Sequence, residues 1–227
     1  MNKKIILTSF IIIIFTIFSA SVINAATVSF FIGKVTVKDA NTWVKAKVGM
    51  NLTVNSEIKT GKNALAIITL KRGSTIKLRE NSSLKLKEEG AAQSENVSFE
   101  LLNGSVFSKI LKRKAGEVYN IRVGTIVVAV RGTEFFVAQE TINKKRKDLW
   151  VCVNEGAINI TRTTDKKSVV IPEGKGVLIK ATNEFTPAKE YRWTRKLNWN
   201  MNPKKGTVVD QTDILKAYYD ILDFDYD

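Results

Sequence analysis

Glycine recurs at intervals of 8 to 17 residues between positions 33 and 132, and short runs of alternating apolar and polar residues lie between the glycines. Tight turns often need a positive φ, which glycine adopts most readily. No proline occurs before Pro172, and proline is rare inside sheets because it cannot donate to the ladder. This pattern restricts the chain to many short strands joined by turns.

The alternation locates individual strands. Residues 75–79 and 83–87 alternate strictly, which predicts one buried face and one charged face. Residues 64–70 and 126–130 are almost entirely apolar, which predicts strands covered on both faces. We therefore predict an all-β fold, with many short strands in a twisted sandwich or a solenoid-like stack. Apolar residues spaced by three and four over 211–222 predict one short C-terminal helix.

Residues 1–25 have the features of a secretory signal peptide. Lys3 and Lys4 precede an apolar run over 5–18, and small residues such as Ala25 and Ala26 follow it. The run is shorter than the about 20 apolar residues that span a bilayer. We expect cleavage, with an uncleaved anchor as the alternative, and no transmembrane segment afterwards. The expected destination is the periplasm, with the cell surface or the exterior as alternatives.

The mature chain is expected to be strongly basic. Residues 1–25 hold two lysines and no acid, so their removal leaves 34 basic and 22 acidic side chains. An exported protein rarely meets nucleic acid, so we expect none as a partner. An envelope protein or an anionic envelope polymer fits the charge better. The alternative is that the abundance of Lys, Asn and Ile reflects an AT-rich genome without selection for binding.

The composition excludes several kinds of active site. The chain has no histidine and one cysteine, which rules out a Ser-His-Asp triad, a Cys-His dyad, an internal disulfide and a Cys-rich zinc site. Glu134 and Glu155 are two carboxylates for glycoside hydrolysis, but that chemistry needs both acids to face one cleft. Cys152 has no histidine to activate it. We expect no enzyme activity, no catalytic residue, no metal and no cofactor.

Two segments of the predicted all-β domain are candidates for contacts. Arg131 and Thr133, on either side of Gly132, offer a donor fork and a hydroxyl to an anionic or carbohydrate group. The structural alternative is a turn in which Thr133 bonds a neighbouring carbonyl. A basic hairpin tip is either a solvated turn or a binding site, and comprises Lys144, Lys145, Arg146 and Lys147.

The chain changes character near its C-terminal end. We expect an all-β domain over 26–186 and an extension over 187–227 that either packs back on the sheet or engages a partner. The extension mixes aromatic and basic residues, among them Arg192, Trp193 and Trp199. Such residues are enriched at binding hot spots, and their alternative role is to cover an open end of the sheet.

Several short motifs, in order, resemble the periplasmic FecR domain. Residues 58–61 are similar to its I-x-T-G turn, and 66–74 to a strand that ends in Asp-Gly-Ser, with Arg72 in place of the aspartate. Residues 121–137 resemble the most specific part, in which Arg-Gly-Thr is followed by an apolar strand. The motif residues are Gly61, Gly73, Ser74, Gly104, Arg131, Gly132, Thr133, Phe135, Val137, Glu155, Gly156 and Gly174.

The resemblance covers roughly residues 30–180 and implies mainly structural roles for the motif residues. Iron-uptake sensors of the family carry a cytoplasmic anti-sigma segment and a membrane helix before this domain, whereas a signal-like segment precedes it here. They also end in a transporter-contacting domain, for which 187–227 is too short. The resemblance therefore implies an exported, non-catalytic binding or scaffold module of the bacterial envelope. The alternatives are a basic adhesin or polysaccharide-binding protein, and an enzyme acting on wall polymers.

Overall fold

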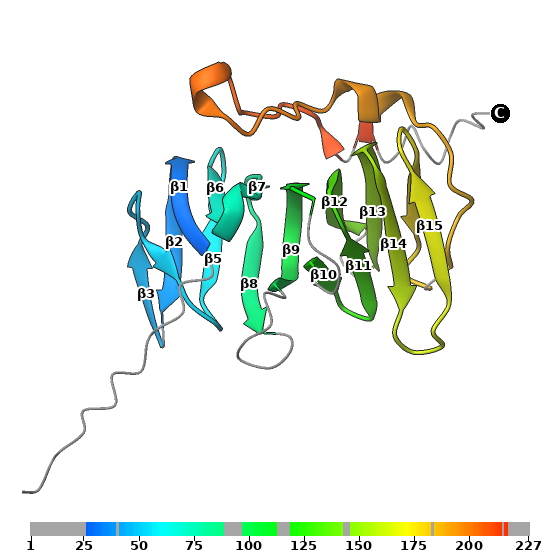
Figure 1. Cartoon of the computed structure of the whole chain (residues 1–227), viewed down its shortest axis with the longest axis horizontal. Helices are drawn as coiled ribbons and strands as arrows, with labels where there is room; N and C mark the ends of the chain where they lie inside the picture. Colours follow the sequence, from blue (N-terminus) through cyan, green and yellow to red (C-terminus); the bar gives the residue numbers. More distant parts are fainter. Residues whose placement is uncertain are drawn as a thin grey trace, which may run out of the picture.

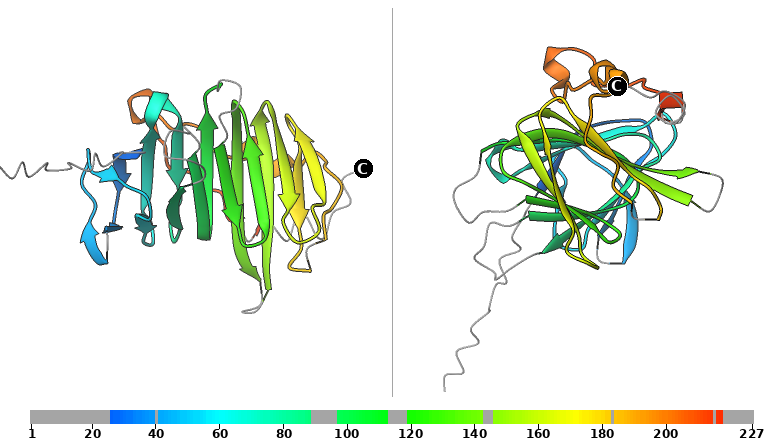
Figure 2. Two further views of the ribbon diagram at one scale, coloured as in Figure 1. Left: turned by 60° about the horizontal axis from the view of Figure 1, so that its bottom comes forward. Right: turned by 90° about the vertical axis from the view of Figure 1, so that its right-hand side faces the viewer.

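The computed structural model describes residues 26–39, 41–88, 97–112, 119–142, 146–182, 184–214 and 216–217. These residues form sixteen short strands and three 3-10 turns. The strands follow one another along the long axis in nearly the order of the sequence (Figure 1). Viewed along that axis, they surround a common interior (Figure 2). The predicted all-β class is confirmed.

The strands form two sheets, which we call sheet A and sheet B. Every neighbouring pair in sheet A is antiparallel. In order across that sheet, its strands are β4 (Asn51–Leu52), β1 (Ala26–Ile32), β6 (Leu65–Leu70), β7 (Thr75–Leu78), β9 (Val97–Ile110), β12 (Thr133–Ile142), β13 (Arg146–Glu155) and β16 (Gly176–Ile179).

Sheet B is also antiparallel, except where β9 and β10 run parallel. Its outermost strands are β3 and β15, each paired on one side within the described residues. In order across the sheet, its strands are β3 (Thr42–Lys45), β2 (Val35–Asp39), β5 (Glu57–Thr60), β8 (Ser83–Glu88), β9, β10 (Tyr119–Val123), β11 (Ile126–Val130), β14 (Ala157–Arg162) and β15 (Ser168–Pro172).

Strand β9 belongs to both sheets. Its first half pairs with β8 and β10, and its second half pairs with β7 and β12. The partners change at Gly104, where φ is 82°. A Cβ atom at this position would lie 2.3 Å from the Ser82 hydroxyl oxygen. Only glycine combines this backbone conformation with so close an approach, so Gly104 permits one continuous sheet to fold into two layers.

The main hydrophobic core lies between the two sheets. Because successive side chains of a strand point to opposite faces, each alternating strand contributes one row to it. Ile68 and Val106 come from sheet A, and Ile58, Ile121 and Val128 come from sheet B. Each of them is at most 2% exposed, so a single apolar layer joins the two sheets along the length of the stack.

The outer faces of the sheets differ. The outer face of sheet A is apolar and packs against the C-terminal extension in two clusters. One contains Phe107 and Trp150, and in the other Val208 packs with Leu65 and Ile67, which accounts for the two-sided apolar pattern at 64–70. Among the described residues, no segment covers the outer face of sheet B in this way. Val127 and Ala129 of β11 point outward and are half-buried, so the prediction that 126–130 is covered on both faces is only partly met.

The extension leaves the edge of β16 and crosses sheet A. Two bridges, between Gly176 and Lys189 and between Ile179 and Phe185, attach its start to β16. It contains the 3-10 turns η2 (Arg192–Lys196) and η3 (Pro203–Lys205). The predicted helix over 211–222 is not shown, since half of its residues lie outside the described ones. The described part contains no helix long and apolar enough to span a membrane.

Candidate functional site

The Arg131-Gly132-Thr133 motif forms the turn between β11 and β12. Thr133 is buried, and its hydroxyl donates to the carbonyl of Ala157 at 3.1 Å, as the structural interpretation predicts. Gly132 has φ of 81°, and a Cβ there would lie 2.8 Å from Cγ of Lys112. Arg131 is exposed at the end of β11. Gly132 and Thr133 therefore have structural roles in this turn: Gly132 allows its backbone conformation, and Thr133 bonds the neighbouring strand.

Most other motif residues also lie at turns or in the core. Phe135 and Val137 are fully buried on β12. The Ser74 hydroxyl accepts the Leu111 N–H at 3.1 Å, which ties the turn after η1 (Lys71–Gly73) to the end of β9. Arg72 has φ of 67° in that turn. Of the remaining motif glycines, Gly61 follows β5, Gly73 ends η1, Gly104 lies within β9, Gly156 is at a bend and Gly174 is at a turn.

Of the two carboxylates singled out for hydrolysis, one is already engaged in hydrogen bonds. Glu134 is buried, and it accepts bonds from Nζ of Lys109 at 3.3 Å and from the Asn154 amide at 2.6 Å. Glu155 lies opposite Glu134 on the neighbouring strand and is exposed. Burial raises the pKa of the Cys152 thiol, so the thiolate is disfavoured. The described residues contain no group of three or more His, Cys, Asp or Glu able to hold a metal.

The extension packs its apolar side chains onto the outer face of sheet A. The Trp199 ring meets the Phe107 ring edge-on, with centroids 5.2 Å apart. Of the two alternatives for the extension, packing back on the sheet is the one observed. The buried residues of this cluster are Phe107, Phe136, Ala138, Trp150, Cys152 and Leu178 of the sheet, and Tyr191, Leu197, Met201, Ile214 and Ala217 of the extension.

Asparagine side chains hold two arms of the extension together. The Asn198 amide donates to the carbonyls of Thr207 and Val209, each at 3.0 Å. The Asn200 amide donates to the carbonyls of Gly206 at 3.2 Å and Thr207 at 3.0 Å. Residues 198–202 and 206–210 therefore form an outward and a returning arm, which meet over β6 and β7.

Lys77 lies beneath both arms and is 1% exposed. Its ammonium donates to three carbonyls: Asn198 at 2.5 Å and Asn200 at 3.0 Å from the outward arm, and Val208 at 3.1 Å from the returning arm. It also lies 4.1 Å from the centroid of the Phe107 ring. Burial lowers the pKa of Lys77 to about 8. The strict alternation of 75–79 predicted a charged outer face, and the solvent exposure that this implies is wrong for Lys77.

Arg79 and Asp210 form a second anchor, two residues further along each segment. The Arg79 guanidinium lies 3.3 Å from the Asp210 carboxylate and donates to the Thr212 carbonyl at 2.6 Å. The other oxygen of Asp210 accepts the Asn198 N–H at 2.5 Å. Both side chains are largely buried. The anchor therefore holds both arms of the extension on the sheet through charged, partly desolvated contacts.

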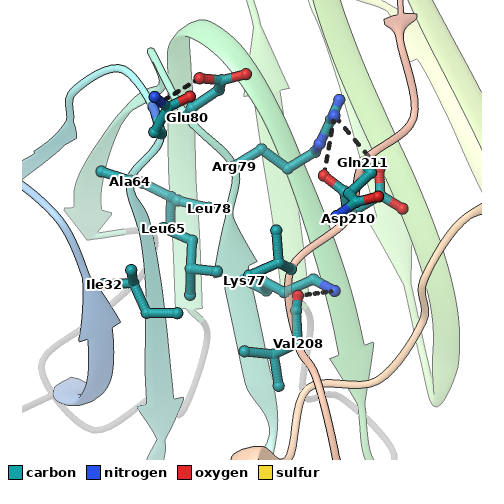
Figure 3. A pocket seen from close by; sticks show the side chains of 12 residues that line it. Ile32, Ala64, Leu65, Lys77, Leu78, Arg79, Glu80, Val208, Asp210 and Gln211 are labelled. Carbon is teal, nitrogen blue, oxygen red and sulfur yellow. Dashed lines mark hydrogen bonds and ion pairs between the residues drawn. The ribbon is translucent and has the colours of Figure 1, made fainter.

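A pocket of about 280 Å³ opens between the returning arm and sheet A (Figure 3). Ile32, Leu65 and Val208 form its apolar side, while Lys77 and Arg79 reach toward the extension. Lys77 and Arg79 are already bonded to the extension. The arrangement can hold a covering segment on a sheet, and it offers no nucleophile and base in contact.

The sequence-predicted contact residues are dispersed. Lys144 and Lys145 lie outside the described residues. Arg146 begins β13, and Lys147 is exposed on it. Arg192 and Trp193 lie in η2 over sheet A. Trp199 contacts Phe107 and so acts in covering a face of the sheet, where the expectation was an open end.

A family model described as FecR protein matches residues 56–159. Residues 56–159, just under half of the chain, therefore resemble a FecR domain. The match begins at β5 and ends within β14, so it includes Lys77 and Arg79 but neither the extension nor β1 to β4. No curated protein matches the chain in sequence.

Two crystal structures match part of this chain. Both are of a protein from Parabacteroides distasonis described provisionally as an anti-sigma factor, at 2.50 Å and 1.65 Å resolution. Each is 18% identical in sequence, with TM-scores of 0.49 and 0.48. Each alignment covers 59% of this chain and 59% of the other.

The residues that anchor the extension were missed by sequence reasoning. Lys77 and Arg79 look like the solvent face of a half-buried strand when 75–79 is read alone. The signal that identifies them is the neighbouring run 64–70, whose apolar residues on both faces require a cover. A lysine on the next strand then lies beneath the same cover.

Proposed function

We propose that the chain is an exported, non-catalytic binding or scaffold module of the bacterial envelope. The observation that carries the proposal is the resemblance of residues 56–159 to a FecR domain, within an all-β stack and preceded by a signal-like segment. Binding would use strand edges and loop tips, by addition of a strand or by charged contacts. The partner would be an envelope protein, with no nucleic acid involved.

The geometry of the reactive side chains supports a non-catalytic role. Glu134 already accepts two hydrogen bonds, and Cys152 is buried beneath the extension. Purified chain from Ala26 onward should therefore produce no clearing in zymography against cell-wall polymers. Clearing that disappears in Glu155→Gln would refute the non-catalytic proposal.

Binding is tested by retention of envelope components on the folded chain from Ala26 onward. The same chain, heat-denatured, is the control for non-specific capture. We expect a defined component to be retained by the folded bait, and its identity to be the same across repeated envelope preparations. Retention equal to that of the denatured bait would refute the proposal.

Export is proposed on the signal-like segment alone. A chain with residues 1–25 should be recovered from the periplasm, shortened by cleavage near Ala25, and a chain without them should remain in the cytoplasm. Equal distribution of both forms would contradict export. We also propose that residues 211–222 form the short helix that their apolar spacing predicts.

A second candidate is binding of an anionic polymer on the outer face of sheet B. Lys38, Lys59 and Lys85 come from three successive strands of that face. Glu57 pairs with Lys59 at 3.0 Å and offsets part of the charge. Retention on an anionic glycan matrix that collapses with added salt would support this candidate, because salt screens exposed charges. Retention unchanged by Lys38→Glu would count against it.

A further inference from the structure

Strand β3 is an open edge of sheet B. It is the outermost strand and pairs only with β2 among the described residues. All four of its residues are exposed. Its second side therefore presents backbone N–H and C=O groups that another strand can pair with.

The exposed apolar side chains of the described residues are concentrated in the first part of the chain, and two of them lie on β3. Of the nine large apolar side chains that are exposed in the described residues, five lie within 32–54. They are Ile32, Trp43, Val44, Val48 and Val54. Concentration of exposed apolar surface at one end of a molecule is typical of an interaction site.

The two faces of β3 have different chemistry. Val44 pairs with Val37, which is 1% exposed in the main core, so Val44 continues the apolar inner face. Trp43 pairs with Lys38 on the outer face, where Nζ of Lys59 lies 4.2 Å from the Trp43 ring centroid. Lys45 shares the face of Trp43, because alternate residues of a strand point the same way. A partner strand should therefore be apolar on one face and acidic on the other.

Residues 223–227 of this chain have that pattern. They read Asp-Phe-Asp-Tyr-Asp, so in an extended strand three acids share one face and two aromatics share the other. We propose that β3 pairs with residues 223–227 of a second copy of the chain. The aromatic rings then cover Val44, and the carboxylates lie beside Lys38, Lys45 and Lys59.

The reach of the chain favours a second copy over self-pairing. Ala217 packs in the cluster that contains Phe136 and Trp150 of β12 and β13, and Figure 1 places β3 at the far end of the stack. The six steps from Ala217 to Asp223 span at most about 22 Å. Four strand spacings from β9 to β3 amount to about 19 Å, and the separation of the two sheets adds about 10 Å in another direction.

Each copy would offer one open edge and one acidic segment, which are different parts of the chain. Such a contact is heterologous and extends head to tail without closing unless the geometry forms a ring. The inference is independent of the proposed envelope function, because it concerns only contacts between copies. Retention of an envelope component by the monomer would leave it unaffected.

Sedimentation velocity of the chain from Ala26 onward, over a wide concentration range, tests the inference. We expect the mass to rise from one chain to two and more with concentration, and the chain ending at Leu222 to stay monomeric. Lys45→Glu should weaken association about tenfold or more, which corresponds to about 1.4 kcal/mol. Lys85→Glu is the matched control on the same face, three strands away from the edge.

Mixing gives a second readout that does not depend on how the wild type polymerises. The chain ending at Leu222 keeps the β3 edge, and Lys45→Glu keeps the acidic segment, so their mixture should form a one-to-one dimer. Three results would overturn the proposal: a wild type that is monomeric at all concentrations, a shortened chain that associates equally well, or equal weakening by Lys45→Glu and Lys85→Glu.

Discussion

Replacement of Lys77 by methionine removes the ammonium under the extension and keeps a side chain of similar length. Three carbonyls in one buried and two part-buried hydrogen bonds lose their donor, at a cost of about 2 kcal/mol each. The pKa of Lys77 is lowered from 10.5 to about 8, so the protein disfavours the charged side chain by about 3 kcal/mol. Methionine carries no charge, and the substitution therefore recovers this free energy. We expect a net destabilisation of about 3 kcal/mol, with the extension loosened before the sheets.

Denaturant unfolding measures the net change, and hydrogen exchange read by mass spectrometry locates it. Exchange should accelerate over 198–210 more than in β12 and β13. Lys85→Met, a lysine on the outer face of sheet B, is the control and should change stability by no more than about 0.5 kcal/mol. Equal effects of the two substitutions, or no local acceleration over 198–210, would refute the anchoring role.

Four further outcomes are expected. The unfolded chain binds more protons than the folded one between pH 8 and 10.5, so the Lys77 contribution raises the unfolding free energy by about 3 kcal/mol across that window; subtracting the Lys77→Met titration isolates it, and identical pH profiles would contradict it. Phe135→Ala should cost about 3–5 kcal/mol in denaturant unfolding, because the ring is fully buried, whereas exposed Lys147→Ala should cost at most about 0.5 kcal/mol. Gly104→Ala should cost more than about 3 kcal/mol by the same measurement, since its φ of 82° is strained for alanine and no space exists for Cβ; a near-neutral effect would show that β9 can bend without glycine. Cys152 should resist alkylation until the protein unfolds, because the thiol is buried and burial raises its pKa; rapid labelling of the native protein would show that the extension opens readily.

Much of the fold follows from period-two alternation, because one buried face per strand is a local property. The predicted strands at 64–70, 75–79 and 126–130 correspond to β6, β7 and β11. Which strands share a sheet does not follow, since β9 changes sheets at Gly104 through a close approach to Ser82. Gly104 and Ser82 are 22 positions apart in the sequence. The only feature of the sequence near position 104 that indicates their contact is the glycine itself.

The candidate site was less predictable than the fold. Lys77 and Arg79 have the side chains of a solvated strand face, and alternation alone assigns them to solvent. Their burial depends on residues more than a hundred positions later, with Lys77 bonded to Asn198 and Arg79 to Thr212. A local pattern contains no information on such a partner, so only the apolar run at 64–70 hinted at a cover.

The extension contributes energy on the scale of the stability of a whole domain. Its removal would expose Phe107, Phe136, Trp150 and Leu178, each at most 2% exposed at present. Each of these side chains contributes about 1.5–3 kcal/mol through burial, so together they approach the about 5–15 kcal/mol that stabilises a typical domain. Lys77 would also lose all three acceptors. The change in composition near residue 186 therefore does not mark the end of a folding unit. We expect sheet A and the extension to fold together.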